Sequence, residues 1–331
     1  ILKVNSMKYL PLVALICTGC SLVPSAPKGP VMPRIQGEWW QVAGNPDLGE
    51  LNGNMPGDEG PIQEPVDFSV WQAADGTWQL WSCIRATKCG GHTRLFHGWE
   101  GRNLTDRDWK PTGIKMQADL KFENSVGGLQ APHVVLIDDV YHMFYGDWDF
   151  MAIQRSQDGK TFDRWLYDDG RTPPIGMFTE GQGVNTRDPM AIRIGDKWHI
   201  YYTAYPDKVG AVYCRTSTDL REWSESTVVS RGGLTGRNPF SSECPHVVQL
   251  GDDFYLFRTQ RYHMPPTTSV YRSKDPMDFG VDSDEKFVCL LEVAAPEIFV
   301  HDGEFYIAAL MPDIQGIRIA RLAWVTDEVA E

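Results

Sequence analysis

The sequence predicts an all-β protein folded as a five-bladed β-propeller. Five segments of the 331-residue chain share one pattern: a proline or acidic residue, an apolar strand, a turn with Asp or Gly, and a second, aromatic strand. They read VDFSVWQAADGTWQLWS from residue 66, APHVVLIDDVYHMFYG from 131, RDPMAIRIGDKWHIYYT from 187, ECPHVVQLGDDFYLFRT from 243 and APEIFVHDGEFYIAAL from 295. The aromatic residue that opens each second strand recurs at steps of 63, 57, 56 and 51 residues, at Trp78, Tyr141, Trp198, Phe254 and Phe305. A repeat of this length, with strand alternation and no long helical period, is typical of propeller blades.

A second set of motifs follows the hairpins and completes each unit. The motifs are NLTDRDW from residue 103, SQDGKTFDRW from 156, STDLREW from 217 and SKDPMDF from 273. Asp and Asp-Gly turns before an aromatic residue suit the tight turn that leads into an outer strand. Five units of four strands predict one propeller domain over residues 36–331, with a β-sandwich as the rival fold. Residues 24–64, rich in Pro, Gly and Asn, predict a tether, assigned to 21–35, and an arm that crosses the surface.

Composition and charge restrict the ligands. The formal net charge is −13, and no basic run occurs in the chain. Phosphate binding needs clustered Lys and Arg, so nucleic acid is excluded as a partner. The 12 tryptophans are a high count, and such side chains either pack cores or line sugar sites.

The N-terminal stretch MKYLPLVALICTGCSL, from Met7, has the pattern of a signal peptide that is too short to span a bilayer. It resembles a bacterial lipoprotein signal in which Cys20 is acylated, so residues 1–20 are expected to be the signal. Cys17, at the third position before the cut, is less usual there than leucine and leaves ordinary secretion open. The resemblance implies export to the periplasm or outer membrane, with the membrane contacted only through the lipid anchor.

Five cysteines remain beyond the signal, and none forms a C-x-x-C pair. An odd number in an oxidising compartment leaves at least one free thiol. Cys83 and Cys89 could bridge a hairpin; the alternative is five small apolar side chains.

Acidic residues recur where the hairpins begin. The first strand of each propeller blade starts near the central axis, so the residues that open the hairpins should converge. Like charges aimed at one axis repel and destabilise the fold, which is typical of functional sites. The residues at or within two positions of these starts are Asp67, His133, Asp188, Glu243 and Glu297.

These motifs resemble those of the five-bladed propeller glycoside hydrolases of family 43 and its relatives, families 32, 68 and 117. DFSVW is similar to the family 43 strand that carries the general base, which implies that role for Asp67. RDPMAI resembles the aspartate-proline motif of families 43 and 32, which makes Asp188 the residue that orients the sugar and tunes the acid. ECPHVV is similar to the motif that holds the acid in both families, which makes Glu243 the general acid.

The chain also departs from these families. Phe68 stands where proline usually follows the base. The family 32 motif W-M-N-D-P-N-G and the C-terminal sandwich are absent from the sequence. The fifth blade lacks the G-H-G pattern that surrounds the axial metal of many family 43 members, which counts against an axial calcium; no cofactor or metal is expected.

Further residues have two readings each. The histidines could bind sugar hydroxyls or pack at strand ends, and Glu297 could bind a hydroxyl or be structural. The arginines could hold an acidic substituent or neutralise the acids, and Trp71 could stack on a sugar or lie in the core. The candidate substrate-binding residues are His133, Arg187, His246, Glu297, Trp71 and Arg258.

Glycosidic cleavage requires a protonated carboxylic acid and an ionised carboxylate on opposite sides of the anomeric carbon. The resemblance therefore implies an exported glycoside hydrolase that acts on oligosaccharides or polysaccharides. It is expected to be exo-acting and inverting, with an arabinofuranosidase-like or xylosidase-like activity. The alternatives are a glycan-binding propeller without catalysis and a phosphorylase-like relative.

Overall fold

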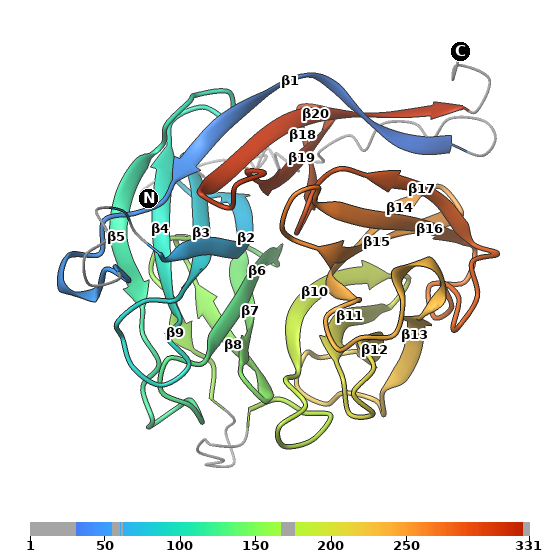
Figure 1. Cartoon of the computed structure of the whole chain (residues 1–331), viewed down its shortest axis with the longest axis horizontal. Coiled ribbons are helices and arrows are strands. Elements are labelled where there is room, and N and C mark those ends of the chain that lie inside the picture. Colours follow the sequence, from blue (N-terminus) through green and yellow to red (C-terminus); the bar gives the residue numbers. More distant parts are fainter. Residues whose placement is uncertain (1–30, 55–59, 61, 167–175, 327–331) are drawn as a thin grey trace, which may run out of the picture.

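The predicted five-bladed β-propeller is confirmed by the computed structural model, which describes residues 31–54, 60, 62–166 and 176–326. Five four-stranded antiparallel sheets surround a central axis (Figure 1). Within the described residues there is no α-helix, only the 3-10 turns η1 (Gly49–Leu51) and η2 (Gly233–Thr235). No helix in that part of the chain has the length and apolar character needed to cross a membrane. The predicted signal segment and Cys20 lie outside the described residues.

Blades I to IV each contain four consecutive strands, running from the axis outward. Blade I contains β2 (Glu64–Gln72), β3 (Trp78–Arg85), β4 (Leu95–Gly101) and β5 (Lys110–Met116). Blade II contains β6 (Leu129–Ile137), β7 (Val140–Asp147), β8 (Phe150–Ser156) and β9 (Asp163–Arg164). Blade III contains β10 (Arg187–Ile194), β11 (Lys197–Ala204), β12 (Ala211–Ser217) and β13 (Thr227–Arg231). Blade IV contains β14 (Glu243–Leu250), β15 (Asp253–Arg261), β16 (Thr267–Ser273) and β17 (Phe287–Leu291).

Blade V joins the two ends of the described chain. It contains β18 (Glu297–His301), β19 (Glu304–Leu310), β20 (Gly316–Thr326) and, as its outer strand, β1 (Val31–Gly44). The pairing of β1 with β20 extends from Val31 opposite Thr326 to Gly44 opposite Gly316. The propeller therefore starts at Val31, within the predicted tether, and 31–44 is a blade strand where the sequence predicted an arm. Pro33 and Gly37 obscured this strand in the sequence, but an outermost strand tolerates both residues.

The inner strands share an unusual backbone feature at the axis. One residue at the head of each has a left-handed backbone, with φ between 37° and 58°, although none of the five is glycine. In blades I to IV the pairing with the next strand slips at this point, as in a β-bulge. We call these residues the axial ring: Asp67, Ala131, Asp188, Cys244 and Ala295. Proline follows all of them except Asp67, which is followed by Phe68.

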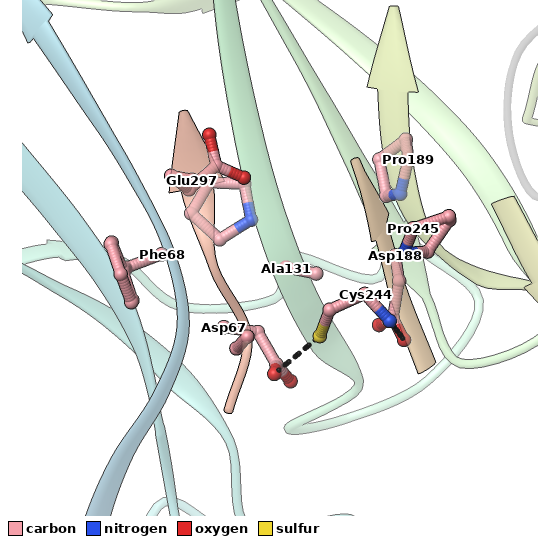
Figure 2. A pocket seen from close by; sticks show the side chains of 10 residues that line it. Asp67, Phe68, Ala131, Asp188, Pro189, Cys244, Pro245 and Glu297 are labelled. Atoms are coloured by element: carbon pink, nitrogen blue, oxygen red, sulfur yellow. Dashed lines mark hydrogen bonds between the residues drawn. The ribbon is translucent and has the colours of Figure 1, made fainter. Parts of the chain in front are cut away.

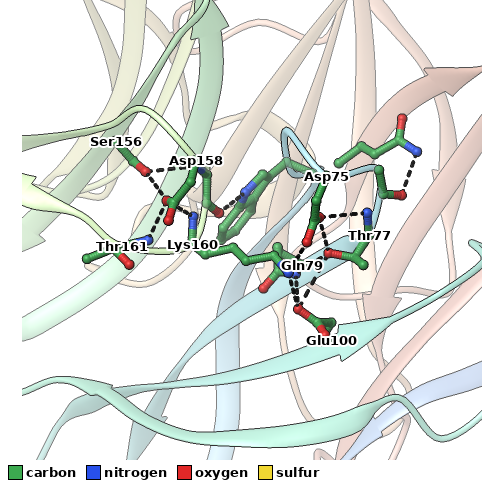
Figure 3. Close-up of polar contacts among 12 residues, drawn as sticks. Asp75, Thr77, Gln79, Glu100, Ser156, Asp158, Lys160 and Thr161 are labelled. Carbon is green, nitrogen blue, oxygen red and sulfur yellow. Dashed lines mark hydrogen bonds and ion pairs between the residues drawn. The ribbon is translucent and has the colours of Figure 1, made fainter.

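The second set of sequence motifs forms the expected tight turns. In the turn at residues 156–161, Oδ1 of Asp158 accepts hydrogen bonds from the Ser156 hydroxyl and from two backbone N–H groups, those of Lys160 and Thr161, at 2.7–2.8 Å. Lys160 then pairs with Asp75 and Glu100 of blade I, at 2.6 Å each (Figure 3). This turn therefore ties blade II to blade I.

The cores lie within and between the blades and are rich in aromatic residues. Trp99, Tyr145 and Phe257 are among the largest fully buried side chains. All five described cysteines are free thiols, so Cys83 and Cys89 form no disulfide here. Cys83 is fully buried, as expected for a small apolar side chain, whereas Cys89 is partly exposed.

Asp158→Ala should lower the free energy of unfolding by about 1–2 kcal/mol, because one hydroxyl and two backbone N–H groups lose their acceptor. Burial opposes ionisation of Asp158, but its backbone hydrogen bonds outweigh burial and lower its pKa to about 2. The loss in free energy of unfolding should therefore have its full size above the ordinary pKa of 3.8 and become smaller as pH falls toward 2.

Urea unfolding of Asp158→Ala can be compared with that of Asp252→Ala. Asp252 is exposed in the turn between β14 and β15, so its replacement should change stability by less than about 0.5 kcal/mol. Equal stability of the two variants at neutral pH would contradict the structural role of Asp158.

Candidate functional site

Three axial-ring side chains that carry a carboxylate or a thiol meet at one end of the propeller axis. Asp67 comes from β2, Asp188 from β10 and Cys244 from β14, and one ligand atom of each lies within 4.8 Å of the other two. Figure 2 shows Asp67 and Asp188 on either side of Cys244. They border a cavity of about 20 Å³ whose lining is Asp67, Phe68, Ala131, Pro132, Asp188, Pro189, Cys244, Pro245, Ala295 and Glu297.

Asp67 is held by two donors on one oxygen. The Tyr262 hydroxyl donates to Oδ1 at 2.6 Å, and the Cys244 thiol donates to the same atom at 3.0 Å. Burial and the neighbouring carboxylates raise the pKa of both donors well above their ordinary values, so both keep their protons. Among the described residues nothing hydrogen-bonds to Oδ2, which leaves that oxygen for a ligand or water.

Asp188 is almost fully buried and only partly satisfied. Its Oδ2 accepts a hydrogen bond from the Cys244 backbone N–H at 3.1 Å and lies 3.6 Å from Nε of Arg187. Its buried Oδ1 has no partner among the described residues. Burial raises the pKa of Asp188 to about 7; Arg187 opposes this shift, and the charges of Asp67 and Glu243 add to it.

Glu243 precedes the ring residue Cys244 and pairs with an arginine. Nη2 of Arg187 donates to its Oε1 at 2.7 Å. Aromatic rings lie near this guanidinium, with the centroids of Tyr205 and Phe240 at 5.6 and 5.9 Å. Burial raises the pKa of Glu243, while Arg187 opposes the shift. Of the two readings of Arg187, the structure favours neutralisation of the acids.

Two positions beyond the ring residues, a second polar layer crosses the axis. Glu297 lies between His133 and His246, with each Nδ1 atom 3.6 Å from a carboxylate oxygen. Burial opposes ionisation of Glu297, but His246 and His133 outweigh it and lower its pKa to about 2. Glu297 borders both the small cavity and a larger one of about 660 Å³ on the far side, which the two histidines also line. This layer separates the two cavities.

The second layer does not suit the axial calcium of the related families. Calcium takes six to eight oxygen ligands, whereas the side chains around Glu297 there are imidazoles.

Two predicted substrate residues are buried and do not line the small cavity. Trp71 is buried, donates its indole N–H to Gly159 O at 2.8 Å and packs on Trp81. Arg258 is fully buried and donates to Ser230, Thr235 and Tyr271, the carbonyl of Gly232 being a further acceptor. Both predictions are corrected: their polar atoms serve contacts within and between blades.

The sequence also underrated two residues. Neither Tyr262 nor Cys244 is predicted as a site residue from the sequence, yet both hydrogen-bond to Asp67. A signal for Cys244 was present, because it precedes Pro245 as Asp188 precedes Pro189. Aligning the repeats on these prolines places Cys244, and not Glu243, at the ring position. Tyr262 lies in the turn after β15 and had no such signal.

Comparisons with known proteins identify the fold. No family model and no curated protein matches the chain. Among solved structures, a thermostable family 43 glycoside hydrolase superimposes with a TM-score of 0.60 at 15% identity, over 82% of this chain and 93% of that one. The chain shares the propeller fold of glycoside hydrolase families 43 and 32.

Two further structures share this fold. An endo-arabinase from Bacteroides thetaiotaomicron matches with a TM-score of 0.60 at 12% identity, over 85% of this chain and 99% of that one. A family 32 β-fructofuranosidase from Bombyx mori matches at 0.57 and 16% identity, over 86% of this chain and 62% of that one. At these identities the likeness establishes the fold.

Asp188→Asn should stabilise the protein at neutral and alkaline pH. An acid whose pKa is higher in the folded than in the unfolded chain destabilises the fold as pH rises from 3.8 to about 7. The gain should be absent below pH 4 and reach roughly 1–4 kcal/mol above pH 7. Asparagine also tolerates the left-handed backbone at this position.

Thermal unfolding from pH 4 to 8 measures this difference. A variant that is less stable than the parent at pH 8, or equally stabilised at every pH, would show that ionisation of the buried Asp188 carboxylate does not destabilise the fold.

Proposed function

We propose that this protein is a glycoside hydrolase in which Asp67 is the general base, Glu243 the general acid and Asp188 the residue that orients the sugar. The observation that carries the proposal is the convergence of three carboxylates with different environments at the axis end of this fold. Asp67 is oriented by two neutral donors, whereas burial raises the pKa of Glu243 and Asp188. Separated environments of this kind allow one carboxyl to donate a proton while another accepts one.

Each residue has a role that its contacts support. Glu243 donates its proton to the leaving oxygen, and Arg187 then stabilises the carboxylate that forms, since its guanidinium lies 2.7 Å away. Oδ2 of Asp67 activates the attacking water, because Oδ1 is already taken by Tyr262 and Cys244. The unpartnered Oδ1 of Asp188 is free to accept a hydrogen bond from a sugar hydroxyl.

The second polar layer favours exo action. Glu297 with His133 and His246 closes the axis beneath the carboxylates, so a sugar bound over the small ring-side cavity meets a blind end. A blind end accepts a chain terminus more readily than a chain interior. The substrate we propose is a terminal pentose, arabinofuranose or xylose, on an oligosaccharide or polysaccharide. The endo-arabinase among the structural neighbours is consistent with the class of sugar and does not support exo action.

A screen of aryl glycosides and natural oligosaccharides, with and without phosphate, identifies the substrate. Asp67→Asn and Glu243→Gln should then each reduce kcat at least about 100-fold, because general base and general acid each contribute that much or more. Asp252→Asn and Glu285→Gln, which alter exposed carboxylates, serve as matched controls. Near-parental turnover by either folded site variant would remove that residue from its role, and dependence on phosphate would indicate a phosphorylase.

Hydrolysis should proceed with inversion. Asp67 lies in a strand similar to that of family 43, and we assign its free oxygen to a water molecule and not to the anomeric carbon. Proton NMR of the first-formed product should show the anomer opposite to that of the substrate. Retained configuration would make Asp67 a covalent nucleophile and overturn this step.

We also propose export with a lipid anchor on Cys20, because the N-terminal sequence resembles a lipoprotein signal. The protein expressed in a bacterial host should partition into the detergent phase, and Cys20→Ala should move it to the aqueous phase. Aqueous partitioning of the parent would contradict the anchor.

A further inference from the structure

Cys244 places a sulfur atom between two aspartates at the axis end. Its Sγ lies 3.0 Å from Oδ1 of Asp67, and ligand atoms of Asp67, Asp188 and Cys244 all lie within 4.8 Å of one another. The other ring positions, Ala131 and Ala295, carry only methyl groups. The side chains that can bind a ligand therefore face a small space that no other ring side chain fills.

A second observation points to a ligand in this space. Oδ1 of Asp188 is buried without a hydrogen-bond partner, although the residue is only 3% exposed. The cavity that Asp188 borders has a volume of about 20 Å³, enough for a single water-sized species. An unsatisfied carboxylate oxygen beside a space of this size suits one small cation.

The local charge favours a cation as well. Arg187 contacts Asp188 and Glu243, and the charge of Arg85, which is itself paired with Glu64, also acts on Asp67. These two guanidinium groups serve four carboxylates, which leaves the buried acids incompletely neutralised. A divalent ion would neutralise them and give the free Asp188 oxygen a partner.

The donor set selects the ion. Calcium and magnesium prefer all-oxygen sites, whereas zinc accepts thiolate and carboxylate together and binds with four ligands. Zinc lies about 2.3 Å from sulfur and about 2.0–2.2 Å from carboxylate oxygen, so ligand atoms 3.0 Å apart need only small shifts to surround it. Tyr262 can support this arrangement, because its hydroxyl lies 2.8 Å from Sγ and 2.6 Å from Asp67.

We propose that Asp67, Asp188 and Cys244 form a binding site for one zinc ion, with water as the fourth ligand, and that zinc and the sugar exclude each other. On binding, the Cys244 S–H bond breaks, the proton passes to solvent, and the sulfur electron pair forms the Zn–S bond. The ion would occupy both the base and the sugar-orienting residue. The inhibition depends on the proposed function, whereas zinc binding does not.

Isothermal titration calorimetry of the full chain with zinc tests the site. Cadmium provides a second probe, because its thiolate complex absorbs in the ultraviolet. The parent should bind one ion with release of a proton. Cys244→Ser should bind at least about tenfold more weakly and show no thiolate absorption. Cys89→Ser, which removes the partly exposed thiol of the β3–β4 turn, should bind like the parent.

Asp188→Asn gives an independent check, because it should weaken zinc binding while its thermal unfolding shows that it is folded. Absence of stoichiometric binding to the parent, or equal binding by Cys244→Ser and the parent, would overturn the site. If a glycoside is hydrolysed, zinc should raise its apparent KM without lowering kcat at saturating sugar; zinc that binds without this competition would overturn the exclusion. If no glycoside is hydrolysed, the binding experiments still decide the site.

Discussion

The left-handed residue at the head of each inner strand is the constraint on which this site depends. A non-glycine residue with positive φ costs about 1–3 kcal/mol when held in a sparsely populated region, and it persists only where its surroundings fix it. Here the feature occurs in all five blades, and four of the five residues precede a proline, which further restricts the backbone. In blades I to IV a bulge interrupts strand pairing at this point, and in all five blades the left-handed residue borders the small cavity at the axis. Two ring positions have alanine, so the other three side chains share the space.

Electrostatics explains why this arrangement needs support. Three carboxylates in one buried region repel one another, and among the described residues only Arg187 supplies a full charge at hydrogen-bond distance, to Glu243. Tyr262 and Cys244 supply neutral donors to Asp67, and the Cys244 backbone N–H supplies one to Asp188. Burial of the remaining charge is unfavourable and raises the pKa values of Asp188 and Glu243. A carboxyl with a raised pKa is suited to proton transfer. The proposed reactivity is thus opposed to stability at this site, while the turns and the β1–β20 pairing hold the propeller together elsewhere.

The sequence predicted those features that repeat. Hairpins, tight turns and the acids at their heads recur at regular steps, so the five blades and the convergence of Asp67 and Asp188 could be predicted. The positions and contacts of residues that do not belong to the repeated pattern could not be predicted. The outer strand 31–44 belongs to a blade whose other strands lie near the opposite end of the chain, and its Pro33 and Gly37 resemble a linker. Trp71 and Arg258 lie in strands beside the site, but their contacts with Gly159, Ser230 and Tyr271 depend on packing between distant segments. The role of Cys244 required one further step, the alignment of the repeats on their prolines.

A crystal structure of the Glu243→Gln variant with an oligosaccharide substrate tests the central claim most directly. The account predicts a terminal sugar at the axial ring, with its glycosidic oxygen at the amide that replaces the Glu243 carboxyl, a hydroxyl at Asp188 and its anomeric carbon facing a water on Asp67. A sugar bound on the outer surface, in the 660 Å³ cavity beyond Glu297, or at the ring with Asp67 turned away from the anomeric carbon, would contradict it.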